Sequence, residues 1–262
     1  MVVPMNTTNY KKHGTPPFQI ILVHGGPGAI GDLNPLARRL GESFGVIETL
    51  HYAKSIDGQI NEIKDAIITD GKTPVKLVGH SWGAWLCYIY ASRYPEHVNK
   101  LIMLSSGTFN PELRDHIAVT RNRRLKSKDF EKFRQLQKQL SSKEASIRNN
   151  AFCEMGNMLV KLDSYEIQKG MNYQTACRHD VFKGVYPEAD ELRNSGALIR
   201  MGHQINCPVV AIHGDYDPHP REGIEDPLKK ILRNFDFYSI EKCGHYPWLE
   251  KYSSETFYKI LK

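Results

Sequence analysis

The segment from Val75 to Tyr94, VKLVGHSWGAWLCYIYASRY, decides the fold. A short apolar run ends in GHSWG at residues 79–83, and an apolar helical pattern follows at once. The pattern G-x-S-x-G between a strand and a helix is typical of a sharp turn with a nucleophilic serine at its apex. The flanking glycines let strand and helix pass closely, and the helix N-terminus offers N–H groups to a developing anion. The segment therefore predicts Ser81 as a nucleophile.

Two later segments offer the partners that such a serine needs. An apolar run at residues 207–212 predicts a buried strand, and it leads into HGDYD at 213–217. A second predicted strand, 235–240, leads into EKCGH at 241–245. A serine nucleophile needs a base within hydrogen-bond reach and an acid that orients the base. His245 is the candidate base and Asp217 the candidate acid, with Asp215 as the alternative acid.

A glycine-rich loop precedes these motifs. Residues 18–23, FQIILV, predict a buried strand that ends in HGGPG at 24–28. A loop of this kind beside the serine turn can aim a backbone N–H at a substrate oxygen, and the N–H of Trp82 would be the second donor. We interpret His24 as a structural residue that holds this loop.

Together these motifs resemble those of α/β hydrolases, specifically the proline-iminopeptidase-related branch with its HGGPG and G-x-S-W-G patterns. The similarity covers most of the chain outside its middle third. The resemblance implies a Ser-His-Asp triad of Ser81 as nucleophile, His245 as general base and Asp217 as acid. It also implies that Gly26 and Trp82 donate the N–H groups of the oxyanion hole, and that no cofactor or metal takes part.

The sequence departs from the pattern of that branch in three places. Loop-like residues fill 6–9 and 14–17, so the usual N-terminal hairpin is expected to be reduced or missing. TLHYAKS at 49–55 replaces a D-x-R-G-x-G-x-S loop. Pro218 stands where some iminopeptidases carry an acidic residue that binds the substrate amine. An ester or small amide is therefore the favoured small-molecule substrate, with iminopeptidase action as the alternative. A ligand-binding or sensing module on a hydrolase scaffold is a third possibility, which the complete triad disfavours.

Alternating strands and helices predict an α/β fold with a doubly wound, mostly parallel sheet. We expect helices at 32–44, with Asp32 as N-cap, at 57–68, with Ile68 facing inward, and at 82–94. The strand–helix rhythm stops at residue 107, and helices are expected at 129–140, 142–161 and 164–171. These boundaries predict a core domain of residues 1–106 and 205–262 and a helical cap of residues 107–204.

Composition narrows the function classes. The 262 residues carry a formal net charge of +6, with 24% charged and 40% hydrophobic residues, as in ordinary globular domains. The basic run at 121–128 is expected to be a solvated helix face, and no nucleic-acid-binding motif accompanies it. No membrane-spanning run or signal-peptide pattern is present in the sequence. Five scattered cysteines without a CxxC pair predict free thiols and a cytoplasmic protein.

A metal site is the rival interpretation of one cluster. His213, Asp215, Asp217 and His219 alternate in sequence, so on a regular strand they would face the same way. Gly214 and the proline at 218 make a regular strand unfavourable there, and a metal would deprive the serine of its acid. We therefore expect no metal. The sequence does not indicate an oligomeric state.

Overall fold

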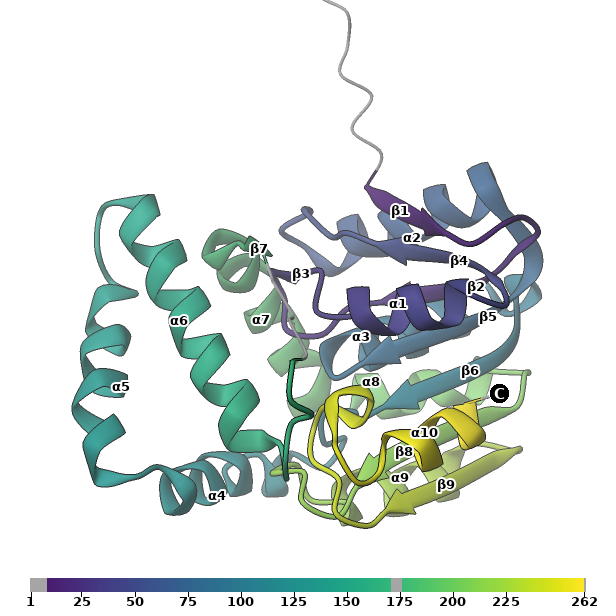
Figure 1. The fold of residues 1–262 in the computed structure, drawn as a ribbon. Coiled ribbons are helices and arrows are strands. Elements are labelled where there is room, and N and C mark those ends of the chain that lie inside the picture. Colours follow the sequence, from purple (N-terminus) through teal and green to yellow (C-terminus); the bar gives the residue numbers. More distant parts are fainter. Residues whose placement is uncertain (1–8, 171–175, 262) are drawn as a thin grey trace, which may run out of the picture.

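The computed structural model describes residues 9–170 and 176–261. A seven-stranded sheet runs through its centre in the order β1-β4-β2-β5-β6-β8-β9 (Figure 1). Strand β1 pairs antiparallel with β4, and the other neighbours pair parallel. Strands β3 and β7 form a separate two-stranded sheet. The strands are β1 (Tyr10–His13), β2 (Phe18–Val23), β3 (Ala29–Ile30), β4 (Gly45–Thr49), β5 (Gly71–His80), β6 (Val98–Leu104), β7 (Ala176–Cys177), β8 (Val209–Gly214) and β9 (Phe235–Ile240).

Ten α-helices and four short 3₁₀ helices lie in the described ranges. The α-helices are α1 (Asn34–Gly41), α2 (Ile56–Asp70), α3 (Trp82–Arg93), α4 (His116–Arg124), α5 (Ser127–Gln139), α6 (Ala145–Asp163), α7 (His179–Asn194), α8 (Ala197–Arg200), α9 (Glu222–Ile231) and α10 (Ser254–Leu261). The 3₁₀ helices are η1 (Pro95–His97), η2 (Pro111–Leu113), η3 (Met201–Gln204) and η4 (Pro247–Leu249).

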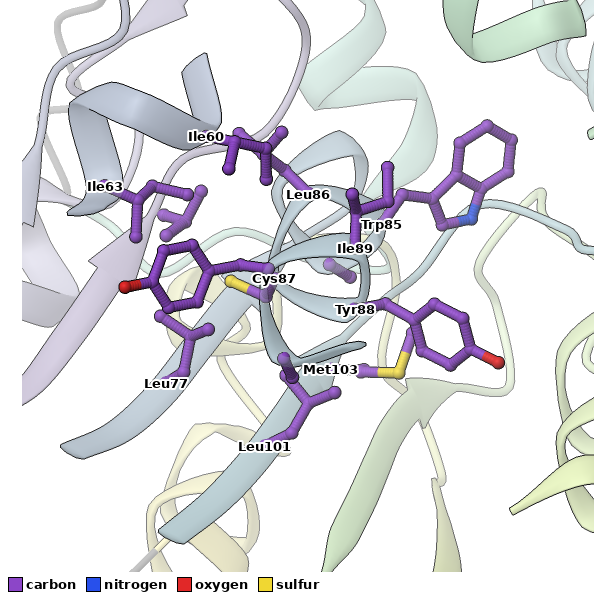
Figure 2. Close-up of a cluster of buried hydrophobic side chains, with 14 of the residues drawn as sticks. Ile60, Ile63, Leu77, Trp85, Leu86, Cys87, Tyr88, Ile89, Leu101 and Met103 are labelled. Carbon is purple, nitrogen blue, oxygen red and sulfur yellow. The ribbon is translucent and has the colours of Figure 1, made fainter. Parts of the chain in front are cut away.

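Successive residues of the central strands point into two separate hydrophobic layers. In β2, Ile21 packs in the layer that holds α2, α3 and α9, whereas Leu22 packs in the layer that holds α1 and α10. The same alternation runs through β6 and β8, as expected for a strand buried on both faces. Figure 2 shows the first layer, in which α3 contributes Trp85, Leu86, Tyr88 and Ile89. The predicted doubly wound, mostly parallel sheet is therefore confirmed.

The parallel strands bring four predicted motifs to one edge of the sheet. The loops after β2, β5, β8 and β9 carry HGGPG, Ser81, Asp217 and His245, respectively. All four strands point the same way, so these loops leave the sheet at the same edge. Local sequence placed the motifs at strand ends, and the sheet order places the loops together.

Several local predictions agree with the structure, whereas those for Asp32 and Ile68 do not. The strands expected at 18–23 and 235–240 and the helix expected at 82–94 match β2, β9 and α3, and one strand, β1, precedes β2 in the described residues. Helix α1 begins at Asn34 with Leu33 as N-cap, and Asp32 lies buried one residue earlier, so the expected capping role of Asp32 is wrong. Ile68 is 62% exposed, which corrects its predicted inward position on α2.

Helices α4 to α8 follow β6 and precede β8 in the chain, within the range predicted to form a cap. In Figure 1, α4, α5 and α6 lie to one side of the central sheet. The helix expected at 164–171 is wrong, because residues 164–170 form a non-helical segment in which Ile167 bridges to Glu250. Met171 itself lies outside the described residues. The division into core and cap domains remains a prediction.

Two of the five cysteines are joined, which corrects the expectation of five free thiols. A disulfide links Cys153 of α6 to Cys177 of β7, with their Cα atoms 5.4 Å apart. The residues lie 24 positions apart with no diagnostic spacing, so this pairing could not be predicted from the sequence. Cys87, Cys207 and Cys243 are free.

Within the described residues, none of the helices combines the length and apolar character that a bilayer crossing needs.

The contact between the end of β2 and the start of α3 generates a stability prediction. A Cβ at Gly83 would lie 2.2 Å from the carbonyl oxygen of Val23. Since both atoms belong to rigid backbone, Gly83→Ala is expected to lower the free energy of unfolding by about 1–3 kcal/mol, measured by urea denaturation. Gly156→Ala is the matched control, because a Cβ there meets nothing within 4 Å. Equal stability of the wild type and Gly83→Ala would contradict the close approach.

Candidate active site

Ser81 occupies the turn between β5 and α3 in a backbone conformation that residues with a Cβ rarely adopt. Its φ and ψ angles are 53° and −114°. The surrounding structure maintains them, because its N–H donates to Leu104 O at 2.9 Å and its carbonyl accepts from Ala84 N at 3.1 Å. Strained backbone of this kind concentrates at functional sites. Ser81 lies half-buried at the wall of two neighbouring pockets.

His245 and Asp217 form a buried hydrogen-bonded pair at the same edge of the sheet. The Nδ1 atom of His245 lies 2.7 Å from Oδ2 of Asp217. Burial by itself would raise the pKa of Asp217, but the imidazoles of His245, His213 and His219 hold this pKa well below its usual value. An ionised carboxylate only accepts, so the Nδ1–H of His245 is the donor and Nε2 is left to accept a proton. Burial also lowers the pKa of His245 to about 3, although Asp217 acts to raise it.

A second imidazole shares the same carboxylate. The backbone N–H of His219 donates to Oδ1 of Asp217 at 2.9 Å, and its Nδ1 lies 2.8 Å from that oxygen. The His219 ring stacks on the His245 ring, with centroids 4.6 Å apart and an interplanar angle of 18°. Both oxygens of Asp217 therefore have N–H donors, which fixes the carboxylate and the His245 ring together.

Asp215, the alternative acid, is placed elsewhere. It is exposed, and its Oδ1 accepts the backbone N–H of Cys243 at 3.2 Å. This contact ties the loop after β8 to the loop after β9. The carboxylate that contacts His245 is that of Asp217.

The glycine-rich loop is held by a hydrogen-bond network that the sequence did not predict. Asp32 Oδ2 accepts the backbone N–H of Gly25 at 3.1 Å and lies 3.0 Å from Nδ1 of His80. His80 in turn donates from Nε2 to the carbonyl oxygen of His245 at 2.9 Å. Asp32 thus connects the loops that carry HGGPG, Ser81 and His245. His24 also supports the loop as predicted, since its Nδ1 lies 2.8 Å from Gly25 O.

Helix α6 and the segment after it hold the His245 loop from the other side. The carbonyl of Asp163 accepts the His245 backbone N–H at 2.9 Å, and its carboxylate binds Arg121 of α4 through two nitrogens. The buried Glu250 accepts the backbone N–H groups of Gly244, Tyr165 and Glu166, each at 2.8 Å. Arg121 is partly buried in this ion pair, so the prediction of a solvated face is wrong for this residue.

Two pockets meet at Ser81 and Gly26. The first, which we call the apolar pocket, has a volume of about 200 Å³ and also includes His245, Asp32 and Arg121. Most of its wall is hydrophobic: Phe152, Met155, Leu159, Val160, Phe182 and Leu249. The second, which we call the charged pocket, has a volume of about 420 Å³ and includes Trp82 and His219. Two acids and two arginines also line it: Arg114, Asp115, Asp190 and Arg193.

The predicted oxyanion donors lie beside Ser81. Trp82 is the first residue of α3, so its N–H is among those without an intrahelical acceptor. Gly26 has a φ of 36° and lines both pockets together with Ser81. The predicted residues Ser81, His245, Asp217, Gly26 and Trp82 are thus gathered at one edge of the sheet.

The metal hypothesis fits the arrangement poorly. Among the described residues, Asp217, His219 and His245 are the group whose ligand atoms lie within 4.8 Å of one another. Those atoms already face each other at 2.7 to 2.8 Å as hydrogen-bond partners. Asp215, which the sequence-based set required, is bound to the backbone of Cys243. The cluster is explained by hydrogen bonding alone.

The chain belongs to the α/β hydrolase fold family, whose model matches residues 48–252. Over 68 residues it is 35% identical to human epoxide hydrolase 4, a match that spans 26% of this chain and 18% of that protein. Its structure is similar to that of VinJ, with a TM-score of 0.66, 18% identity and coverage of 96% of this chain and 92% of the other. It is also similar to Est816, described as an N-acyl homoserine lactone degrading enzyme, with a TM-score of 0.64, 16% identity and coverage of 96% and 94%. At these identities the structural similarity establishes the fold alone.

The lowered pKa of His245 generates a pH prediction. A general base must be unprotonated, and a lower pKa keeps Nε2 unprotonated to a lower pH. The acid limb of kcat/KM is therefore expected below the ordinary imidazole pKa of about 6.5. The measurement is kcat/KM from pH 4 to 8 with a neutral ester. An acid limb at or above about 6.5 would contradict the effect of burial.

The different contacts of Asp217 and Asp215 generate a paired prediction. Asp217→Asn is expected to reduce kcat by about 10⁴-fold, because an amide can donate to Nδ1 and favours the wrong imidazole tautomer. Asp215→Asn keeps an oxygen for the Cys243 N–H and is expected to retain kcat within about threefold. The measurement is the steady-state kcat of the two variants, and circular dichroism checks that both are folded. A larger loss in Asp215→Asn would transfer the role of the acid to that residue.

Proposed function

We propose that the protein is a serine hydrolase that cleaves a small-molecule ester or amide through an acyl-enzyme. Ser81 is the nucleophile, His245 the general base and Asp217 the acid of the triad. The observation that carries the proposal is the shared pocket: Ser81, on a strained turn, and His245, hydrogen-bonded to an ionised Asp217, line the same cavity. The family and the lactone-degrading enzyme among its structural neighbours support the reaction class.

The reaction proceeds in two halves. In the first, Nε2 of His245 removes the Oγ proton of Ser81 as Oγ attacks the substrate carbonyl carbon. The imidazolium is stabilised by Asp217, and the oxyanion accepts hydrogen bonds from the N–H groups of Gly26 and Trp82. His245 then gives its proton to the leaving group, and the acyl group stays bonded to Oγ. In the second half, water attacks in the same way and releases the acid.

The distribution of acids favours uncharged substrates over N-terminal prolyl peptides. An iminopeptidase must hold an ammonium group beside the scissile bond, and an unpaired buried charge is unfavourable by several kcal/mol. Two of the acids that line the pockets with Ser81 are engaged: Asp190 pairs with Arg114 and Arg193, and Asp32 contacts the Gly25 N–H and His80. Glu154 of α6 pairs with Lys132 and lines neither pocket. The exposed Asp115 in the charged pocket is the acid on which iminopeptidase action would depend.

Removal of the nucleophile tests the proposal. Ser81→Ala is expected to reduce kcat on a 4-nitrophenyl ester by about 10³-fold or more, because no acyl-enzyme can form. The remaining activity would come from the oxyanion donors and substrate binding. Ser105→Ala is a matched control, since Ser105 also has a positive φ but follows β6 and lines neither pocket. Full turnover in Ser81→Ala would refute the proposal.

Substrate preference gives a second prediction. The value of kcat/KM for a short-chain 4-nitrophenyl ester is expected to exceed that for prolyl-4-nitroanilide, after correction for the greater intrinsic reactivity of the ester. Both chromophores are followed by absorbance, and Asp115→Asn serves as the control for an ammonium site. If the prolyl substrate wins by about tenfold or more, and Asp115→Asn removes the advantage, iminopeptidase activity becomes the better assignment.

A further inference from the structure

Gly156 lies inside α6 without a structural reason for being glycine. A glycine in a helix interior destabilises the helix relative to alanine, because it loses more backbone freedom on folding. A Cβ at Gly156 would meet nothing within 4 Å, and its φ lies outside the positive range. Every other described glycine either has a positive φ or would bring a Cβ close to neighbouring atoms. The empty space beside Gly156 therefore needs another explanation.

That space belongs to the apolar pocket. Gly156 lines it together with Ser81 and His245, and the neighbouring α6 positions Phe152 and Leu159 line it as well. Residues 152, 155, 156, 159 and 160 follow the spacing of one helix face, so α6 forms a continuous wall. The C-terminal end of α6 adjoins the base, because Asp163 accepts the His245 N–H. Gly156 lies seven residues earlier, or about 10 Å along the helix axis.

The two pockets suit the two parts of a substrate. After the first half-reaction the acyl group remains bonded to Ser81, whereas the leaving group must depart before water attacks. The apolar pocket offers hydrophobic walls that retain an acyl chain. The larger charged pocket, with Arg114, Asp190 and Arg193, suits a polar leaving group that returns to water.

We propose that the apolar pocket binds an extended, unbranched apolar acyl chain of the substrate, and that Gly156 keeps the room through which the chain passes. The proposal rests on the serine hydrolase function proposed above and adds the substrate class. Each methylene that enters the pocket leaves water, which is expected to raise kcat/KM by about fourfold until the pocket is full. A side chain at position 156 would end that rise at a shorter chain.

The experiment compares 4-nitrophenyl acetate, butyrate, hexanoate, octanoate and decanoate on four proteins. These are the wild type, Gly156→Ala, Gly156→Leu and the control Asn150→Leu, which places the same leucine side chain at an exposed position of α6. Gly156→Leu is expected to lower the ratio of kcat/KM on the longest ester that the wild type prefers to kcat/KM on the acetate by about tenfold or more. Asn150→Leu is expected to keep the wild-type profile.

Gly156→Ala keeps the test informative if leucine disturbs folding. It is expected to raise Tm by about 1–4 °C and to shift the preferred chain length downward by a smaller step. A second arm varies the alcohol chain of acetate esters, and there Gly156→Leu is expected to have no length-dependent effect. If Gly156→Leu loses kcat/KM with increasing alcohol length and not with increasing acyl length, the apolar pocket does not bind the acyl chain.

The outcomes separate this proposal from the one on which it rests. If the wild type hydrolyses the acetate but shows no rise with acyl length, or if Gly156→Leu leaves the rise intact, the acyl-pocket proposal fails and the serine hydrolase assignment stands. If the folded wild type hydrolyses none of the esters in either arm, both proposals fail.

Discussion

The close passage of β5 over the start of α3 is the constraint on which the site depends. A Cβ at Gly79 would lie 2.2 Å from the carbonyl oxygen of Gly83, so the strand and helix can meet only through glycines. The chain must turn sharply between them, and Ser81 takes a positive φ as a result. The buried helix α3 secures this geometry in the core, because its hydrophobic residues pack against the sheet (Figure 2). The packing of α3 in the core thus maintains the unfavourable backbone conformation of Ser81.

Buried charges around Ser81 are balanced by hydrogen bonds that also connect separate loops. Asp217 joins the loops after β8 and β9 through His245, and Asp32 joins the loops after β2 and β5 through Gly25 and His80. Glu250 connects the His245 loop to the segment after α6. A buried carboxylate without such donors would be strongly unfavourable, so each acid is tied to the geometry of its loops. The proposed catalytic groups are consequently positioned by shared acceptors as well as by the sheet.

Sequence predicted the parts of this arrangement that are encoded locally. The serine turn, the HGGPG loop and the strands before Asp217 and His245 each have a signature within a few residues, and parallel strands place such loops at one edge. The contact between His219 and Asp217 could be predicted in part from the sequence. His219 follows Asp217 by two residues, and its backbone N–H donates to the Asp217 side chain.

The remaining features depend on contacts between distant positions. Asp32 resembles a helix cap in sequence, but its partner His80 lies 48 residues away. Arg121 belongs to a basic run that looks solvated, and its ion-pair partner Asp163 lies 42 residues away. The disulfide between Cys153 and Cys177 likewise has no local signature. Such pairs follow from how the helices after β6 pack, which neither periodicity nor spacing specifies.

Covalent acylation of Ser81 can be tested by mapping the site of a covalent label. The folded wild-type protein is treated with a fluorophosphonate, digested and analysed by mass spectrometry for the modified residue. One phosphonyl group per chain is expected, on Ser81, because among the described residues its hydroxyl combines a strained turn with the cavity that it shares with His245. A label on a different residue, or a folded protein that stays unlabelled after prolonged exposure, would contradict the account.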